Sequence, residues 1–418
     1  MIVNQINDGP FSGVRILELA DEKGHWCGKI LGDLGADVIK IEPPGGEQTR
    51  TIGPFYDDEY HKERSLYFWH YNTSKRGVTL NLNTEDGRRI FKELSKTADV
   101  IIETFKPGYL DSLGVGYDVL KKDNKSLIFC SITPFGQSGP WRDFQTSDLL
   151  HLAAGGQMGS CGYDDIDGAP PIAPGGGQAW HMGSHYASMA IAAALIYRAD
   201  SGVGQYVDVS IHESCALTTE GAMSSWIYMG KTMIRQTGRH AGVAPSAPTQ
   251  TLCKDGKYVN IQLIPMRLPP KQLETLANWM DQHGMADDLL DEQYKDTAVI
   301  QERADHISET VRKFINNMTR EDIYRGAQEM GFSWGAVRTH EELVTDGQLI
   351  DRGFWVDVEH PELGKTFSYP GSSAIWSSAK WKIGRRAPLI GEHNEEIYCG
   401  EMSMSKAEIS ILSEINAI

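Results

Sequence analysis

Short apolar segments alternate with helix-like segments over about the first 150 residues, and this alternation most constrains the fold. The apolar segments are rich in Val, Ile and Leu, as buried strands are, and the intervals between them are long enough for helices. One helix is predicted at 26–34, before the stop residue Gly35, and another begins after Asn83 or Thr84 with an acidic first turn. Strands separated by helices pair in parallel, which predicts an α/β fold. The predicted strands are 14–19, 36–42, 77–82, 99–103 and 126–131.

The middle of the chain has a different character. A stretch rich in Gly, Pro and Asp predicts a long loop, and the helix after it is so rich in Ala, Ser and Gly that another element must pack closely against it. Helical stripes from about residue 230 to 330 predict a smaller unit with its own core. The predicted elements are a loop at 153–177, helices at 183–197, 212–229 and 406–415, and strands at 205–211 and 257–263.

The acidic composition narrows the function classes. The 418 residues carry 40 Lys and Arg against 56 Asp and Glu, a net charge of −16, which argues against a nucleic-acid partner. The longest apolar run, 186–197, has about 12 residues, whereas a membrane-spanning helix needs roughly 20. The first ten residues lack a signal pattern, and the six cysteines are scattered without a CxxC pair. We therefore expect a cytoplasmic protein with reduced thiols, without membrane partners.

The common cofactor and metal motifs are absent. The turn after the first strand, 20–28, lacks G-x-G-x-x-G, and the chain has no P-loop. The glycines at 175–177 fit either a tight turn or close approach to an anion. His181 and His185 share a helix face but lack the glutamate of H-E-x-x-H, and the acidic run 164–167 is typical of a solvated loop. We predict no metal site.

Six segments, in order along nearly the whole chain, have a combination of strand ends, Pro-Gly turns and charged residues that is highly specific. They resemble the family III CoA-transferases, the family of formyl-CoA:oxalate and carnitine CoA-transferases. The segments are ADVIKIEPPGG at 36–46, NTSKR at 72–76, DVIIETFKPG at 99–108, SITPFGQSGP at 131–140, GVGQYVDVS at 202–210 and RAPLIGEHN at 386–394.

The resemblance implies a specific architecture. A large Rossmann-like parallel-sheet domain is built from both chain ends, 1–220 and 336–418, and a smaller α+β domain from the middle, 221–335. In this family two chains thread through each other as interlocked rings, so an interlocked, ring-like dimer is expected.

The resemblance also implies a reaction, the transfer of CoA from a thioester donor to a free carboxylate. A catalytic aspartate attacks the thioester carbonyl and forms a mixed anhydride. The CoA thiolate then converts the anhydride to an aspartyl-CoA thioester, and the acceptor acid takes the CoA. The nucleophile must be a carboxylate, because only an acyl anhydride keeps the energy of the thioester available. CoA thioesters are therefore substrates, and no tightly bound cofactor is expected.

The chain departs from the family at the position of that aspartate. The family pattern, laid on residues 170–180, places Trp180 there, or Ala179 after a shift by one residue. No Asp or Glu lies between Gly168 and Tyr197. An indole cannot attack a thioester or carry an acyl group, so we predict that this chain contributes no catalytic residue.

The CoA site departs from the family as well. Ser112 stands where the family often has an arginine that reaches toward CoA. Asp21 and Glu22, followed by Lys23, stand where smaller or neutral residues approach the nucleotide. Negative charge beside a pyrophosphate weakens binding, so we expect the isolated chain to bind CoA weakly or not at all.

Two groups of residues are candidates for ligand contacts. The first group holds family positions near CoA, although its two cations fit a plain surface position equally well. The second fits either a pocket for an aromatic acid or ordinary core packing. The candidate CoA-binding residues are Lys75, Arg76 and Phe105, and the candidate pocket residues are Trp180, His181, Trp226 and Tyr228.

These observations leave alternatives. The first is a non-catalytic subunit that pairs with an aspartate-bearing paralogue in a hetero-oligomer, or forms a homodimer when alone. Within the family the chain is most similar to an aspartate-lacking subunit of the enzyme that moves CoA from succinyl-CoA to (R)-benzylsuccinate in anaerobic toluene degradation. The second is a self-sufficient CoA-transferase or CoA-thioester isomerase with a relocated carboxylate, Asp148 or Asp164. The third is a protein that only binds a CoA ester.

Overall fold

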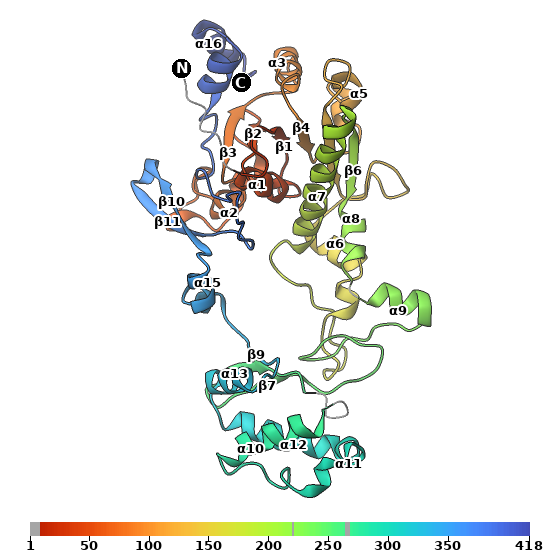
Figure 1. Ribbon diagram of the computed structural model, residues 1–418. Coiled ribbons are helices and arrows are strands. Elements are labelled where there is room, and N and C mark those ends of the chain that lie inside the picture. The colour runs from red at the N-terminus through yellow and green to blue at the C-terminus, as the bar shows by residue number, and fades with distance from the viewer. Residues whose placement is uncertain (1–8, 220, 264–267) are drawn as a thin grey trace. The chain divides into compact units, whose positions relative to one another are not determined.

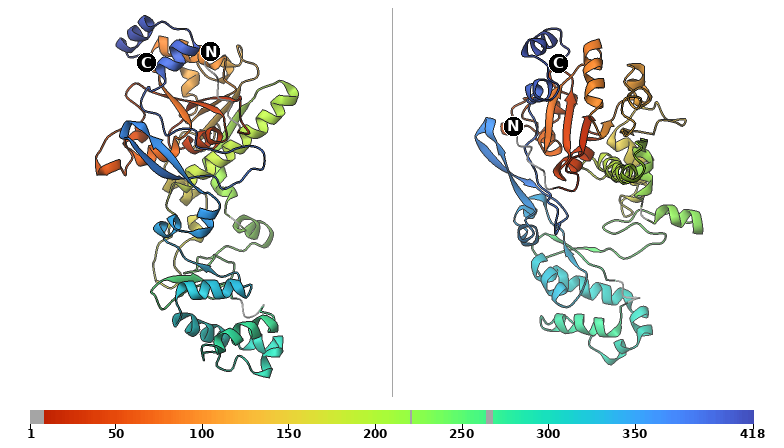
Figure 2. Two further views of the ribbon diagram at one scale, coloured as in Figure 1. Left: turned by 60° about the vertical axis from the view of Figure 1, so that its left-hand side comes forward. Right: turned by 45° about the horizontal axis from the view of Figure 1, so that its top comes forward.

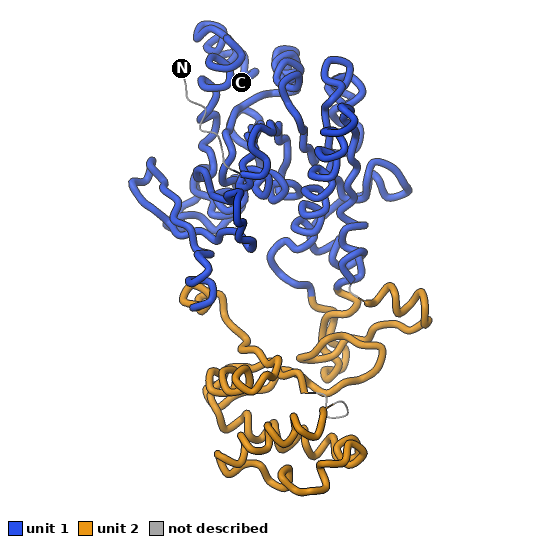
Figure 3. Tube along the Cα trace, viewed as in Figure 1, with its two compact units in different colours: residues 1–157, 173–220, 347–418 blue, residues 158–172, 221–346 orange. Residues whose placement is uncertain are grey.

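The computed structural model describes residues 9–219, 221–263 and 268–418, which form two compact units (Figure 3). Unit 1 comprises residues 1–157, 173–220 and 347–418, and unit 2 comprises 158–172 and 221–346. The sequence predicts boundaries after residues 220 and 335, whereas the units divide after 220 and 346 and the segment 158–172 falls in unit 2. Local contacts account for both differences. Asp164 bonds to Thr237 and Arg239, and Glu342 bonds to Lys257 and Arg320.

Unit 1 is built on a six-stranded sheet in which every neighbouring pair is parallel, as predicted (Figure 1). The strand order is β3-β2-β1-β4-β5-β6, so the chain builds outward from β1 in one direction and then from β4 in the other. The strands are β1 (Arg15–Leu19), β2 (Asp37–Glu42), β3 (Lys75–Thr79), β4 (Val100–Glu103), β5 (Ile128–Thr133) and β6 (Tyr206–Ser210).

One predicted strand is displaced. The sequence places it at 77–82, but β3 begins at Lys75 and ends at Thr79. The apolar run continues beyond the strand because the backbone changes partner. Leu80 still donates its N–H to the Glu42 carbonyl, and the Asn81 N–H then bonds to the carbonyl of Ala417 near the C-terminus.

Different segments cover the two faces of the sheet. The core of one face joins β1–β5 to α3 (Glu85–Ser95) and to the C-terminal residues Ile397, Tyr398 and Leu412. On the other face lie α1 (His25–Asp33) and α7 (Gln178–Ser201). A Cβ on Gly183 of α7 would lie 2.8 Å from the Ile211 side chain, which confirms the close approach that its small residues predict.

The helical stretch predicted at 212–229 is two helices. α8 (Ile211–Leu217) ends at Thr218, and α9 (Ala222–Met229) begins after Gly221, because Thr and Gly favour a helix terminus over its interior. Helix α9 belongs to unit 2. The remaining α-helices of unit 1 are α2 (Leu66–Tyr71), α4 (Tyr109–Ser112), α5 (Tyr117–Leu120), α6 (Asp148–Ala154), α15 (Gly347–Asp351) and α16 (Lys406–Glu414). The antiparallel hairpin of β10 (Trp355–His360) and β11 (Lys365–Pro370) completes the unit (Figure 2).

Unit 2 has its own apolar core, as the helical stripes predict. Leu273, Leu276 and Ile307 are fully buried among the helices, and so is Phe314. The strand predicted at 257–263 is shorter, because regular pairing is confined to β8. The elements are α10 (Pro270–Asp281), α11 (Thr297–Glu302), α12 (Ala304–Asn316), α13 (Arg320–Glu329), α14 (His340–Val344), and a sheet of β7 (Gln250–Leu252), β8 (Tyr258–Asn260) and β9 (Gly335–Ala336). Among the described residues of the chain, no helix has the length and apolar character to cross a bilayer.

Candidate active site

The strand order reverses between β1 and β4, and ligands of open α/β sheets bind at the carboxyl ends of the strands at such a point. The loops after these two strands are joined there. The Asp21 N–H donates to Thr104 Oγ1 (3.0 Å), and the Thr104 hydroxyl donates to Asp21 Oδ1 (2.9 Å). This edge of the sheet is therefore the candidate ligand site of unit 1.

The loop after β1 carries negative charge at this edge. The Lys23 ammonium forms an ion pair with Asp21, so the single cation of the loop is already neutralised. Burial and the neighbouring Asp21 carboxylate raise the pKa of Glu22. One acidic group of the loop is thus ion-paired and the pKa of the other is raised, and weak binding of a pyrophosphate at this edge stays a prediction.

Helix α6 lies beside α7 (Figure 1), and a carboxylate from α6 caps the start of α7. Asp148 Oδ1 accepts a hydrogen bond from the Ala179 N–H (2.8 Å), and the Trp180 backbone also hydrogen-bonds to this carboxylate. An anion at this position stabilises the positive end of the helix. The pKa of Asp148 is nevertheless raised, because burial outweighs the two backbone bonds.

Trp180 lies in the first turn of α7, and its ring packs against the imidazole of His151 with ring centroids 5.7 Å apart. His151 is fully buried, and burial together with the neighbouring His212 lowers its pKa to about 4. Its Nε2 hydrogen-bonds to Thr146 Oγ1 (2.8 Å), whereas no described group bonds to its Nδ1. An aromatic side chain thus packs on a neutral imidazole at the start of α7, and its equivalence to the aspartate position of the family stays a prediction. The sequence offers no motif that singles out His151.

Lys75 lies inside the fold. Its ammonium is fully buried and donates hydrogen bonds to Glu18 Oε1 (2.9 Å), to Asn72 Oδ1 (2.8 Å) and to the His25 carbonyl (3.0 Å). The second Glu18 oxygen lies 2.8 Å from the same ammonium as part of the ion pair. A Cβ on Gly28 would lie 1.6 Å from Glu18 Oε2, so α1 approaches the carboxylate closely at that glycine. The donors of Lys75 are therefore used within the protein, and contact with CoA stays a prediction.

The other two candidate CoA contacts have different surroundings. Arg76 is paired with Asp37 (2.6 Å), Glu396 (2.8 Å) and Glu401 (2.5 Å), which ties β3 to β2 and to the C-terminal segment. Phe105 is half-buried in the loop after β4 and packs on Tyr109, with ring centroids 4.8 Å apart. Phe105 thus lies at the candidate edge, and its contact with CoA also stays a prediction.

Ser112 is exposed at the end of α4 and donates its hydroxyl to the Tyr109 carbonyl (2.6 Å). A guanidinium from elsewhere in the chain lies near this helix. A Cβ on Gly108, which has φ +80°, would lie 3.3 Å from the Arg142 Nη2. No described group bonds to the Arg142 Nε. Arg142 is separated by 30 residues from Ser112, which is why sequence position alone does not identify it.

His181 and His185 belong to an aromatic cluster of unit 1. Tyr71 Oη and His181 Nε2 share a hydrogen bond (2.9 Å), and the Trp26 indole N–H donates to His185 Nε2 (3.2 Å). The His185 Nδ1 is bonded to the His181 carbonyl (2.8 Å). Both imidazoles are thus engaged by neighbouring groups.

The remaining candidates lie in unit 2. Trp226 and Tyr228 are exposed on α9, with 63% and 84% of their surfaces accessible, so a pocket that they share with Trp180 and His181 stays a prediction. The Asp164 carboxylate is paired with Arg239 (2.8 Å) and accepts the Thr237 N–H (2.7 Å). These bonds lower its pKa and fix the loop.

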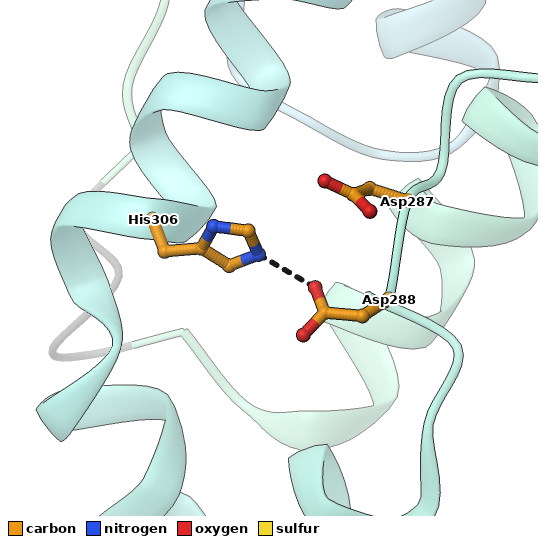
Figure 4. Close-up of side chains that lie close together, drawn as sticks. All are labelled: Asp287, Asp288 and His306. Atoms are coloured by element: carbon orange, nitrogen blue, oxygen red, sulfur yellow. Dashed lines mark hydrogen bonds and ion pairs between the residues drawn. The ribbon is translucent and has the colours of Figure 1, made fainter.

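Asp287, Asp288 and His306 of unit 2 lie close enough together to hold a metal ion (Figure 4). Asp288 is already neutralised, because it bonds to His306 (2.6 Å), to the Arg303 guanidinium (2.6 Å) and to the Tyr294 hydroxyl. A metal ion would have to displace the arginine. The cluster therefore fits a protein-only ion pair better than a metal centre.

The comparison with known proteins connects this site to a family. The model of CoA-transferase family III matches residues 11–394. The chain belongs to this family. It is 34% identical over 397 residues to the succinyl-CoA:(R)-benzylsuccinate CoA-transferase subunit BbsE of Thauera aromatica, covering 93% of this chain and 94% of that relative.

Further relatives and a solved structure agree with this membership. The succinate–glutarate CoA-transferase of Agrobacterium fabrum is 32% identical, covering 93% of this chain and 94% of that relative. The succinyl-CoA–L-malate CoA-transferase beta subunit of Chloroflexus aurantiacus is 30% identical, covering 96% of each chain. A CAIB/BAIF family protein from Brucella suis has the same fold, with a TM-score of 0.79, 30% identity and coverage of 94% of this chain and 99% of that chain. The sequence-based family and the α/β fold with a parallel sheet are thereby confirmed, and the interlocked dimer stays a prediction.

Proposed function

We propose that this chain is the non-catalytic subunit of a heteromeric family III CoA-transferase, acting in the cytoplasm. The observation that carries the proposal is Trp180 at the start of α7, packed on a neutral imidazole where the family has its aspartate. The partner is a paralogue that bears this aspartate. The complex moves CoA from a donor such as succinyl-CoA to an acid such as (R)-benzylsuccinate.

Three further observations support this division of labour. The Asp148 carboxylate is engaged in capping α7, and Asp164 is engaged by Arg239 and Thr237. Two relatives are themselves subunits by name, BbsE and the beta subunit of the L-malate enzyme. The substrates of the proposal come from the name of the first.

The alternative is a self-sufficient transferase or isomerase, and one observation favours it. Asp148 is a partly buried carboxylate at the first turn of α7, and burial raises its pKa. It is therefore the carboxylate that the trapping experiment below must examine first.

We expect no covalent acyl or CoA adduct on this chain. The chain is incubated with succinyl-CoA, alone and with its paralogue, and treated with hydroxylamine or borohydride. Peptide mass spectrometry then finds the trapped carboxylate on the paralogue only, since an indole cannot form the anhydride. The matched variant Asp148→Asn gives the same result in the complex. A trapped Asp148 peptide would overturn the subunit assignment and establish the self-sufficient enzyme.

We also expect the chain not to persist as a folded monomer. Helix α9 exposes a continuous set of large apolar side chains, and a surface of this kind marks a protein contact. Light scattering is expected to find a hetero-oligomer with the paralogue, or a homodimer of the chain alone. A monodisperse, folded monomer at micromolar concentration would contradict this assembly. The exposed side chains are Met223, Trp226, Ile227, Tyr228 and Met229.

A further inference from the structure

A pocket of about 260 Å³ lies at the carboxyl ends of β4 and β5, beside α4 and α5. Side chains alternate along β4, so Glu103 shares a face with Ile101, which belongs to the core on the α3 side of the sheet. The pocket is therefore on the face opposite α7. It is lined by Glu103, Lys106, Gly108, Tyr109, Leu110, Asp111, Gly116, Tyr117, Asp118, Phe129, Ser131, Gln137 and Tyr206.

Glu103 is the most buried carboxyl group of this pocket, with 6% of its surface exposed. Its Oε2 accepts the Phe105 N–H (2.7 Å), and it is hydrogen-bonded to the Ser131 hydroxyl, which in turn accepts from the Tyr206 hydroxyl (2.8 Å). These donors favour the carboxylate. Burial outweighs them and, with the nearby Asp111, raises the pKa of Glu103 to about 7. A positive charge close to Glu103 would stabilise the carboxylate form.

The cations near Glu103 do not supply that charge. Lys106 lines the pocket but is exposed, and it forms no ion pair with any described residue. Lys23 acts on Glu103 from the β1 loop but is already paired with Asp21.

The other charged groups that line the pocket are acidic. Asp111, on α4, lines the pocket, and its charge contributes to the raised pKa of Glu103. A Cβ on Gly116 would lie 1.8 Å from Asp111 Oδ1, so that glycine leaves room for the carboxylate. Asp118, on α5, is exposed and paired with Lys121. The lining thus holds three carboxyl groups against one exposed ammonium. The Arg142 guanidinium is not among the lining groups, although its Nη2 approaches the lining residue Gly108.

The remaining wall is aromatic. The rings of Tyr117, Phe129 and Tyr206 pack together, with centroid distances of 5.6 to 6.0 Å. Tyr109 adds a fourth ring from α4. Faces of aromatic rings attract organic cations, and a carboxylate adds charge and hydrogen-bond acceptors for N–H donors.

We propose that this pocket binds a primary organic ammonium ion, held by the carboxyl groups of Glu103 and Asp111 and bounded by the tyrosine rings. The bound ammonium favours the carboxylate form of Glu103. Binding therefore releases the Glu103 proton to the solvent, while the ammonium keeps its own three protons. The pocket borders the loop that carries Phe105, a candidate CoA contact, because the Phe105 N–H bonds to Glu103. The proposed ammonium site does not depend on the function proposed above.

Calorimetric titration with benzylammonium tests the proposal, and benzyl alcohol serves as the uncharged isostere. Titrations of the chain, or of its complex, are run at pH 7 in phosphate and in MOPS, whose ionisation heats differ and neither of which is a primary ammonium ion. We expect binding of benzylammonium only, with release of about half a proton per site, because Glu103 is about half protonated at pH 7. At pH 8 the release falls toward zero.

Variants separate the contributions of the pocket residues. Glu103→Gln is expected to weaken benzylammonium binding at least about tenfold and to abolish the proton release, since a charged hydrogen bond is lost. Asp111→Asn is expected to weaken binding and to reduce, without abolishing, the proton release at pH 7, because the Asp111 carboxylate contributes to the raised pKa of Glu103. This variant tests the site independently should Glu103→Gln not fold by circular dichroism. The matched control Asp118→Asn changes affinity less than about twofold, because an exposed, paired carboxylate contributes little.

Several outcomes would overturn the proposal. They are the absence of benzylammonium binding, equal binding of benzyl alcohol, or binding that Glu103→Gln leaves unchanged. Potassium chloride that reproduces the proton release at the same concentration would assign the pocket to an inorganic cation instead. Adenosine or CoA that produces the Glu103-dependent signal would assign it to a nucleotide.

Discussion

Replacing Lys75 by Met is expected to lower the free energy of unfolding by about 3–5 kcal/mol, the usual cost of removing one partner from a buried ion pair. The substitution keeps the apolar stem but removes the ammonium that pairs with Glu18 and donates to Asn72. Glu18 is fully buried and keeps only Lys40 as a cationic partner, at 3.3 Å. Burial then disfavours the ionised form of Glu18. The carboxyl group must either take up a proton or become exposed to water through local unfolding.

A double-mutant cycle with Glu18→Gln identifies the source of this loss. If the loss comes from the uncompensated carboxylate, the Lys75→Met, Glu18→Gln double variant is more stable than the sum of the two single effects predicts. Urea unfolding at fixed protein concentration provides the measurement. The control is Lys122→Met, an exposed lysine without a described ion pair, which is expected to change stability by less than about 0.5 kcal/mol. A change of less than about 1 kcal/mol for Lys75→Met would contradict burial and favour a direct ligand contact.

Much of the fold follows from local pattern. A short apolar run such as 99–103, flanked by helical segments, favours a buried parallel strand, and β4 lies where it is predicted. The ends of elements that depend on contacts with distant segments are harder to predict from the sequence. The end of β3 is set by the bond from Asn81 to Ala417, and the break between α8 and α9 follows weak local signals at Thr218 and Gly221. Neither appears in the hydrophobic pattern of its own segment.

Some features of the candidate site can likewise be predicted from the sequence, and others cannot. The prediction that Trp180 replaces a carboxylate of the family comes from the sequence, because it concerns the residue type at one position. The partners of a charged residue cannot be read in this way, since Lys75 and Glu18 are 57 residues apart and meet only because β1 and β3 flank β2. His151, Arg142 and the Glu103 pocket are equally products of tertiary packing. Residues whose chemistry depends on burial could therefore be identified only from the structure.

Glu103 is expected to give the protein a pH-dependent stability that Gln at this position removes. Burial raises its pKa to about 7, against about 4.3 for an unfolded chain. Between these values the folded state binds more protons than the unfolded state, so stability is highest at the acidic end and falls as the pH rises. At about 1.4 kcal/mol for each pKa unit, this carboxyl group removes about 3–4 kcal/mol between pH 4.5 and pH 8.

Unfolding of the wild type and of Glu103→Gln at pH 5, 6, 7 and 8 tests this dependence. The informative quantity is the difference between the two proteins at each pH, because groups common to both cancel. We expect the variant to gain about 2–3 kcal/mol relative to the wild type between pH 5 and pH 8, with most of the gain below pH 7. A constant difference across this range would mean that Glu103 titrates as an ordinary carboxyl group. The gain should shrink when the pocket is saturated with benzylammonium, because a bound cation restores the charge that burial opposes.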